Sequence, residues 1–213
     1  SHYNVVSNIQ QIGQAFALDK NDRILGILPF FHSFGFTGTL WLPALLGSGA
    51  VYHPNPVDGR GIGELVGEHR ATFLLATPTF LQIYMRACTP EQFGSVEFVL
   101  AGAEKLPERL ANAFEDRFGL RPMEGYGTTE TSPVVTINTR DFRSAGFRQV
   151  GAKRGSIGHP LPGMVARIVD PDSGEPLPLG QAGLLLVKGP NVMQGYLGQA
   201  EKTAEVLRDG WYT

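Results

Sequence analysis

The sequence predicts an α/β protein, with a layered parallel sheet and flanking helices, followed by a small β-rich, barrel-like subdomain. From Ile24 to about Glu124, short apolar runs alternate with helical patterns. Strands that alternate with helices along a chain pair in parallel through crossover connections. After about Asn138 the short apolar runs are separated by turn residues, which is typical of antiparallel hairpins. We therefore expect an α/β subdomain over residues 1–139 and a β-rich subdomain over residues 140–213.

The elements of the first subdomain follow in chain order. A helix is expected at the start, where apolar residues recur at helical spacing: Val5, Ile9, Ile12 and Phe16. Strands are expected at the apolar runs Ile24–Leu28, Ala50–His53, Thr72–Ala76, Val96–Ala101 and near Leu120–Met123. Helices between them are indicated by one-sided apolar patterns: Ile62, Leu65, Val66 and His69, then Leu110, Phe114 and Phe118.

The stretch from Ile24 to Val57 carries no fixed charge, so a membrane-spanning helix has to be considered. Such a helix needs about 20 predominantly apolar residues in a row, and Pro29, His32, Pro43 and several glycines interrupt this stretch. A strand, a buried helix and a second strand explain it, because a strand covered on both faces also reads as a continuous apolar run. We expect no transmembrane segment in this chain.

The second subdomain is expected to be antiparallel. Strands are indicated at Val165–Val169 and Gly183–Gly189, with a Pro-Asp-Ser-Gly turn at Pro171–Gly174 between them. The segment Arg140–Gly155 shows no clear period.

Composition excludes some classes of function. The chain has 213 residues, 42% of them hydrophobic, and can bury a sizeable core. A net charge of −2 carries no nucleic-acid footprint. Cys88 is the one cysteine, so the chain can form no internal disulfide and a reducing cytoplasm is expected. Because Cys88 continues a helical apolar pattern with Phe80, Leu81 and Tyr84, we interpret it as a small buried hydrophobe.

Polar and aromatic residues gather after the predicted strands. In an open α/β sheet, ligands bind at the carboxyl ends of the strands. Pro29–Phe36 follows the first strand, Ala101–Leu106 the fourth and Glu124–Pro133 the fifth. The fold is therefore expected to gather these loops along one rim.

The residue types on this rim suit a nucleotide. Glycine on both sides of Tyr126 lets the backbone approach a ligand, while the ring offers a flat face. Thr128 and Thr129 supply donors for phosphate oxygens, and Glu130 supplies a hard oxygen ligand for the magnesium that accompanies them. The Gly102–Ala103 pair is small enough for a flat base to lie against it.

Each feature also has a simpler interpretation. Glycine after a strand often serves a turn, Glu130 can be a solvated acid, and His32 can be a hydrogen-bonded histidine at a strand end. The residues alone make a nucleotide-binding enzyme plausible and do not name its reaction.

A set of ordered motifs resembles the adenylate-forming (AMP-binding) superfamily, which includes acyl-CoA synthetases, luciferases and adenylation domains of peptide synthetases. The motifs are FFHSFG (residues 30–35), LAGAEKLP (100–107), EGYGTTETSP (124–133), GSIGHPLPG (155–163), LLVKGPNVMQGYL (185–197) and DGWYT (209–213). The resemblance implies a ligase that activates a carboxylic acid with ATP to an acyl-adenylate and transfers the acyl group to a thiol.

Within the superfamily, AGAEKLP, FGLRPMEGYGTTE and VKGPNVMQGYL resemble the acyl-acyl-carrier-protein synthetase part of 2-acylglycerophosphoethanolamine acyltransferases. Amino-acid-activating relatives place an aspartate where Phe31-His32 stands, which argues for a plain carboxylic acid here. The resemblance implies a long-chain fatty acid as substrate, and CoA or the phosphopantetheine of acyl carrier protein as acceptor. It also implies a cytoplasmic enzyme whose full-length form can be tethered at the inner membrane.

The resemblance also implies roles for individual residues. As catalytic residues, Glu130 would ligate Mg²⁺, Thr129 would bind the α-phosphate, and His32 would orient the carboxylate or gate the acyl tunnel. The other residues expected to bind the nucleotide are Gly102, Ala103, Glu104, Tyr126, Gly127 and Thr128. The other residues expected to border the acyl tunnel are Phe34, Gly35, Gly38 and Trp41, for which core packing is an equally good interpretation.

Some parts of the family pattern lie outside this sequence: the phosphate loop with its lysine, the Gly-Asp pair that grips the ribose, and the C-terminal lid. We therefore expect a central piece of the enzyme that catalyses little by itself. Two alternatives stay open: a ligase for an aryl or short-chain acid, and a non-catalytic nucleotide- or acyl-binding module.

The segment 140–154 is basic. It carries Arg140, Arg143, Arg148, Lys153 and Arg154 against Asp141. Such loops are commonly solvated and mobile. A sharper hypothesis is a docking patch for an acidic carrier protein or for anionic lipid head groups.

Overall fold

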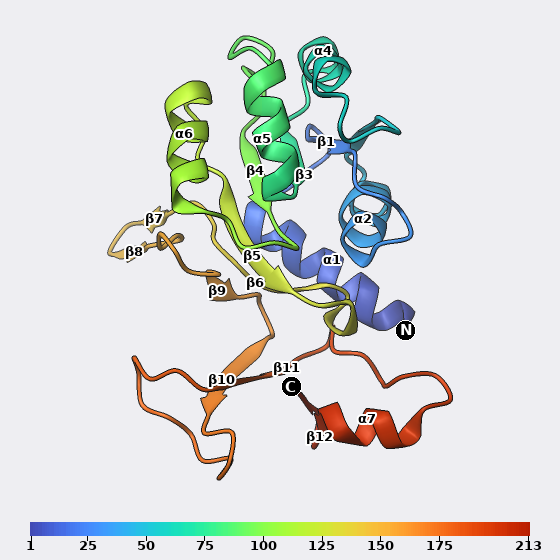
Figure 1. Cartoon of the computed structure of the whole chain (residues 1–213), viewed down its shortest axis with the longest axis vertical. Helices are drawn as coiled ribbons and strands as arrows, with labels where there is room; N and C mark the ends of the chain where they lie inside the picture. Colours follow the sequence, from blue (N-terminus) through green and yellow to red (C-terminus); the bar gives the residue numbers. More distant parts are fainter.

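The computed structural model describes residues 1–213 and contains a seven-stranded, a four-stranded and a two-stranded sheet. Figure 1 shows the large sheet with its helices in one part of the molecule and the four-stranded sheet below it, near the C-terminus. The predicted α/β class with a parallel sheet and a small antiparallel sheet is confirmed.

The large sheet has the strand order β2-β1-β3-β4-β5-β6-β9. The pairs from β2 to β5 are parallel, and β6 and β9 continue the sheet antiparallel. The strands are β1 (Arg23–Gly26), β2 (Gly49–Tyr52), β3 (Phe73–Ala76), β4 (Phe98–Ala101), β5 (Met123–Gly127), β6 (Val134–Ile137) and β9 (His159–Pro160). Since β9 lies beyond residue 139 yet belongs to this sheet, the two predicted subdomains share strands, and their boundary stays a prediction.

Helices cover both faces of the large sheet, and Figure 1 shows α1 on one side and the row α4, α5, α6 on the other. On its side, Phe16 of α1 packs edge-on against Phe73 and Phe98, with ring centroids 5.0 and 5.1 Å apart. A cluster of 36 buried hydrophobic residues fills the two layers. The helices are α1 (His2–Phe16), α4 (Gly59–His69), α5 (Pro78–Ala87) and α6 (Glu108–Phe118).

The uncharged stretch from Ile24 to Val57 consists of the strand β1, a helical segment and the strand β2, as predicted. The helical segment is α2 (Ser33–Gly35), the π-helical turn η1 (Phe36–Trp41) and α3 (Leu42–Leu46). One expectation was wrong: β2 is not covered on both faces but is largely exposed at the edge of the sheet. No helix of the structure is long and apolar enough to span a membrane.

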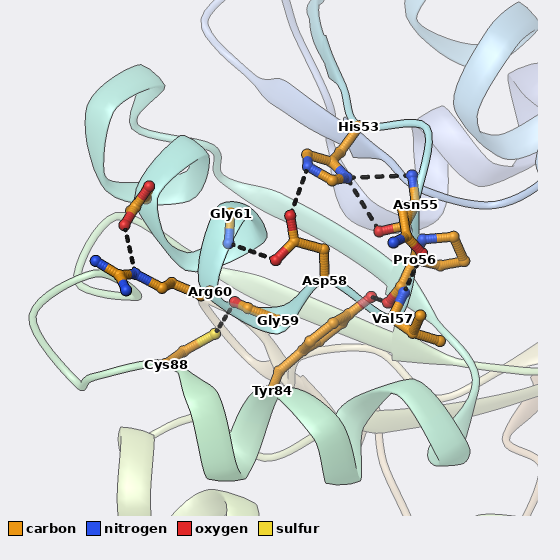
Figure 2. A network of polar contacts seen from close by, with 11 residues as sticks. His53, Asn55, Pro56, Val57, Asp58, Gly59, Arg60, Gly61, Tyr84 and Cys88 are labelled. Carbon is orange, nitrogen blue, oxygen red and sulfur yellow. Dashed lines mark hydrogen bonds and ion pairs between the residues drawn. The ribbon is translucent and has the colours of Figure 1, made fainter.

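A polar network fixes the turn between β2 and α4 (Figure 2). Asp58 caps α4 by accepting a hydrogen bond from the Gly61 backbone, and its other oxygen lies 3.3 Å from Nε2 of His53. The Cys88 thiol donates to the Gly59 carbonyl at 3.2 Å. Cys88 is buried, as predicted, and its burial raises the pKa of the thiol to about 11 although Arg117 acts in the opposite direction.

The fifth strand differs from its prediction. It was expected near Leu120–Met123, but β5 runs over Met123–Gly127 and so takes in the first residues of the predicted Glu124–Pro133 loop. The reason is pairing on both sides, since β5 is parallel to β4 and antiparallel to the fully buried β6. The residues Glu124-Gly-Tyr-Gly127 are not hydrophobic enough to indicate a strand by themselves. The strand is defined by its pairing with β4 and β6.

The four-stranded sheet has the order β10-β11-β13-β12 and is antiparallel throughout. The turn after β10 is held as expected, because the Asp170 carboxylate accepts hydrogen bonds from the Asp172 and Ser173 backbones. The basic segment, for which no element was predicted, forms a hairpin of β7 (Phe142–Ser144) and β8 (Phe147–Gln149). The remaining elements are β10 (Val165–Val169), β11 (Leu184–Lys188), α7 (Ala200–Val206), β12 (Leu207–Arg208) and β13 (Trp211–Tyr212).

Candidate functional site

A cleft of about 200 Å³ lies at the carboxyl ends of the parallel strands. All three loops that the sequence placed on this rim contribute to it. Its lining consists of His32, Ser33, Phe34, Leu100, Ala101, Gly102, Ala103, Gly125, Tyr126, Gly127, Thr128, Thr129, Pro133 and Val134.

His32 and Phe34 enter the cleft from the turn after β1. His32 is the N-cap of α2, and its Nδ1 accepts a hydrogen bond from the Phe34 backbone at 3.2 Å. In the neutral imidazole, Nε2 then carries the proton and is free to donate to a ligand. The buried ring of Phe34 lies against Gly102, where an added Cβ would come within 3.1 Å of it.

Gly102 and Ala103 form a shelf after β4. Gly102 has no room for a side chain beside Phe34, so it keeps the cleft open at this point. Ala103 has φ 67°, in the left-handed region that costs a non-glycine residue free energy. Backbone strain of this kind concentrates at ligand sites, where the surrounding structure enforces it.

Tyr126 of β5 lines the cleft and also a small pocket that it shares with Tyr212, and 37% of its surface is exposed. The glycines beside it have a structural reason that the sequence did not show. A Cβ on Gly127 would collide with the Pro133 carbonyl, and one on Gly125 would lie 3.2 Å from the Thr136 carbonyl. Close approach of the segment that begins β6 therefore requires glycine at position 127 and leaves little space for a side chain at position 125, whether or not a ligand is present.

The loop after β5 is a short 3₁₀ turn, η2 (Thr129–Thr131), tied to the neighbouring segments. The Thr129 hydroxyl lies 3.1 Å from the Ser33 hydroxyl, across the cleft. The Thr37 hydroxyl donates to the Ser132 carbonyl at 3.1 Å. Hydroxyls of the two loops thus meet where a phosphate chain would need donors.

Glu130 is placed by the same turn but does not line the cleft. Its Oε1 accepts a hydrogen bond from the Tyr196 hydroxyl at 2.8 Å. Partial burial acts to raise the pKa of Glu130, but hydrogen bonds from Tyr196 and from the turn's own backbone outweigh it, so the net pKa is lowered. The carboxylate therefore stays ionised at neutral pH.

Buried asparagines support the turn from behind, and sequence reasoning missed them. The Asn8 side chain donates to the Val134 carbonyl at 2.7 Å and accepts from the Val134 backbone at 3.1 Å. The Asn191 amide donates to the Thr131 and Val134 carbonyls at 2.7 and 2.8 Å. Both side chains are fully buried. Asn8 interrupts an apolar helix face. Because a buried amide needs hydrogen-bond partners, its position was the one sequence feature that could have indicated such a contact.

The other predicted site residues lie away from the cleft. Glu104 is exposed, and its carboxylate accepts a hydrogen bond from the Thr79 hydroxyl at 2.8 Å. Gly35 and Gly38 are packing positions, because a Cβ would collide with the Pro29 carbonyl at the first and come within 2.9 Å of Leu75 at the second. Trp41 is 40% exposed on the helical segment.

The donor set suits magnesium only together with a ligand's phosphates. No group of three or more His, Cys, Asp or Glu side chains gathers into a metal site. Mg²⁺ is commonly held by one or two carboxylates plus substrate phosphates. Glu130 beside the Thr128 and Thr129 hydroxyls fits that arrangement.

An open α/β sheet with a shelf of two small residues, an aromatic residue and threonine hydroxyls at its carboxyl edge is typical of a nucleotide-binding enzyme. Residues 1–197 match the family of AMP-binding enzymes. The chain belongs to this family.

Known relatives agree. The chain is 36% identical to feruloyl-CoA synthase of Amycolatopsis sp. over 216 residues, and 33% identical to a long-chain-fatty-acid–CoA ligase of Bacillus subtilis. The first match covers 100% of this chain and 42% of that protein, and the second 99% and 37%. ATP-bound MatB from Rhodopseudomonas palustris superposes with a TM-score of 0.87 at 31% identity, covering 100% of this chain and 40% of MatB. This chain thus spans about two fifths of the length of these relatives.

Proposed function

We propose that the chain is the central part of a ligase that activates a carboxylic acid with ATP to an acyl-adenylate and transfers the acyl group to a thiol. The observation that carries the proposal is the convergence of three loops on one cleft, with the Gly102–Ala103 shelf facing Tyr126 and the threonines. The likeness to an ATP-bound structure and to acid–CoA ligases supports it.

The nucleotide would lie with its base between the Tyr126 ring and the Gly102–Ala103 shelf. Stacking on a flat, partly exposed ring needs no base-specific donor. The Glu104 side chain bonds Thr79, so its share in nucleotide binding would come through the backbone that follows the shelf.

The phosphates would lie along Thr128 and Thr129. A carboxylate that attacks an anionic phosphorus is repelled by it, and donors and cations that stabilise the developing charge lower this barrier. Mg²⁺ held by Glu130 would supply such charge neutralisation. His32, with Nε2 free to donate, would orient the attacking carboxylate.

The acid is proposed to be a long-chain fatty acid. Of the residues predicted to bind the acid, His32 and Phe34 line the cleft, whereas Gly35, Gly38 and Trp41 would act through the shape of the helical segment. An aryl acid is the second candidate, favoured by the 36% identity to a feruloyl-CoA synthase. Assaying the complete gene product with fatty acids of increasing length and with hydroxycinnamic acids separates the two.

The acceptor is proposed to be CoA or the phosphopantetheine of acyl carrier protein. The named relatives are CoA ligases, which favours CoA. The basic hairpin supports the carrier protein, because carrier proteins are acidic and complementary charge steers association.

The first experiment is a calorimetric titration of the complete gene product with a hydrolysis-resistant acyl-adenylate. Tyr126→Ala and Thr129→Ala are expected to weaken binding by roughly tenfold or more, since base stacking is worth about 1–3 kcal/mol and a hydrogen bond to a charged group about 1.5–3 kcal/mol. Tyr3→Ala, on an exposed tyrosine of α1, is the matched control.

Wild-type affinity in Tyr126→Ala and Thr129→Ala would show that the cleft is not the adenylate site. Pyrophosphate exchange that does not depend on a carboxylic acid would exclude acid activation itself. We also expect residues 1–213 by themselves to catalyse little exchange, which the same assay on the isolated chain checks.

A further inference from the structure

Glu130 is held from outside its own loop, by residues that no family motif led us to select as site residues. The Tyr196 hydroxyl donates to Oε1 of Glu130 at 2.8 Å, across 66 residues of sequence. Tyr196 lies in residues 189–199, between β11 and α7, which we call the support loop.

The support loop also holds the Glu130 backbone. The Met193 amide donates to the Glu130 carbonyl at 2.7 Å. The support loop belongs to what we call the second lobe, which is the four-stranded sheet with α7 and their connecting loops. One segment of this lobe therefore contacts both the main chain and the carboxylate of the same residue. The first contact holds the main chain of Glu130 in place, and the hydrogen bond from Tyr196 then holds one of the two carboxylate oxygens.

Tyr196 is itself fixed. Its backbone amide donates to the Thr203 hydroxyl at 2.9 Å. Gly195 has φ 143° and approaches Thr203 so closely that a Cβ would lie 2.6 Å from its methyl group. The Lys202 ammonium lies 5.3 Å from the centre of the Tyr196 ring, within the range of a cation–π contact. Helix α7 thus sets the position of the phenol.

We propose that Tyr196 is a positioning residue for the metal ligand, orienting the Glu130 carboxylate so that its remaining lone pairs receive the divalent cation of a bound metal–nucleotide. This inference rests on the proposed function, in which Glu130 ligates Mg²⁺. It adds that the second lobe, through the support loop, sets the geometry of that ligand.

The test measures Mn²⁺ binding to the complete gene product in the presence of α,β-methylene-ATP, by the electron paramagnetic resonance signal of free Mn²⁺. Tyr196→Phe removes the hydroxyl alone. We expect its Mn²⁺ dissociation constant to rise roughly 10- to 100-fold, the usual effect of removing a group that orients a metal ligand. Binding of the nucleotide analogue without metal is expected to stay unchanged.

Two further variants complete the design. Tyr52→Phe removes a tyrosine hydroxyl that donates to the Thr39 carbonyl at the edge of the sheet, and it is expected to bind Mn²⁺ like wild type. Glu130→Gln removes the proposed ligand. In a steady-state assay, Tyr196→Phe should need more Mg²⁺ for half-maximal rate but reach a near-normal rate at saturating Mg²⁺.

The possible outcomes distinguish metal binding by Glu130 from positioning of its carboxylate by Tyr196. If Glu130→Gln leaves Mn²⁺ binding intact, the metal-ligand part of the proposed function is wrong. If Glu130→Gln weakens binding and Tyr196→Phe does not, the positioning inference is wrong. A lower melting temperature of Tyr196→Phe with unchanged Mn²⁺ affinity would assign the hydroxyl to lobe docking alone, and tighter Mn²⁺ binding would mean that Tyr196 competes with the metal.

Discussion

Cys88 shows at the scale of one residue how burial decides chemical behaviour. Its thiol lies under the turn between β2 and α4, donates to the Gly59 carbonyl and has almost no exposed surface. A thiol in such surroundings is disfavoured as thiolate, which is the nucleophilic form. The residue is therefore a packing element, as its place in a helical apolar pattern predicted.

The raised pKa makes a testable prediction about pH. At pH 8 the native protein should react with a thiol reagent such as Ellman's reagent far more slowly than the denatured protein. Because the folded pKa of about 11 exceeds the reference value of 9.0, the thiol's contribution to stability is complete below about pH 9 and is lost between pH 9 and 11. Fast reaction at pH 8 without unfolding would contradict this assignment.

Single residues of the cleft were predictable where their chemistry is visible in the sequence. Tyr126, Thr129 and the Gly102–Ala103 pair were found because a flat ring, hydroxyls and small residues have a direct chemical meaning beside a strand. Tyr196 was not found, because a phenol in a loop has no special meaning until the carboxylate it contacts is known. Contacts between residues far apart in sequence carry no local pattern.

At the scale of elements, the basic segment 140–154, which contains the hairpin β7–β8, offers fewer unpaired cations to an acidic partner than its sequence indicates. Arg140 lies over the Phe98 ring at 3.9 Å and 3.6 Å from the Glu97 carboxylate, and Arg148 pairs with Asp141 at 3.1 Å. The cations of the segment that form no ion pair are Arg143, Lys153 and Arg154. Any acidic partner would be attracted chiefly by these three.

Reversing these charges tests the docking hypothesis. In the complete gene product, replacing Arg143, Lys153 and Arg154 by Glu should raise KM for acyl carrier protein by roughly tenfold and leave the adenylation rate unchanged, since charges on the rim of an interface act mainly on association. Reversing Arg86 and Arg109, exposed on α5 and α6, is the control. An unchanged KM would exclude the basic segment 140–154 as the docking surface.

Elements were predictable to the extent that their own residues define them. The strands β1, β3 and β4 are fully apolar runs buried in the centre of the sheet, apart from Arg23 at the start of β1, and their residues predicted them. The strand β5 was misplaced because its residues are polar and small, and its position follows from its partners β4 and β6. The hairpin β7–β8 was missed because all of its residues are exposed and give no period.

At the scale of the whole molecule, α1 joins the parts of the protein through buried amides. Asn8 binds the backbone of β6 on both its donor and acceptor groups, and the Asn4 amide donates to the Pro190 and Val192 carbonyls of the support loop. A single helix near the N-terminus thus connects the large sheet and the second lobe. The sequence predicted the helix from its apolar residues but not this connection, since the partners of its amides lie far away in the sequence.

Loss of this connection should be measurable as stability. Asn8→Ala leaves the buried Val134 amide without its acceptor, and an unsatisfied buried donor costs about 1–3 kcal/mol. The Val134 carbonyl keeps its hydrogen bond from Asn191, so the loss is not larger. Gln10→Ala, at an exposed position of the same helix, should change the unfolding free energy little. Equal unfolding free energies of the two variants in urea would contradict the assigned role.

The distance in sequence between Glu130 and Tyr196 has a consequence for the synthesis of the protein on the ribosome. The carboxylate is synthesised 66 residues before the phenol that orients it. At about 5–20 residues per second, roughly 3–13 seconds pass between the synthesis of Glu130 and that of Tyr196. During that interval Glu130 lacks its contacts with Met193 and Tyr196, so the nascent chain acquires the proposed metal-ligand geometry only once translation has passed Tyr196.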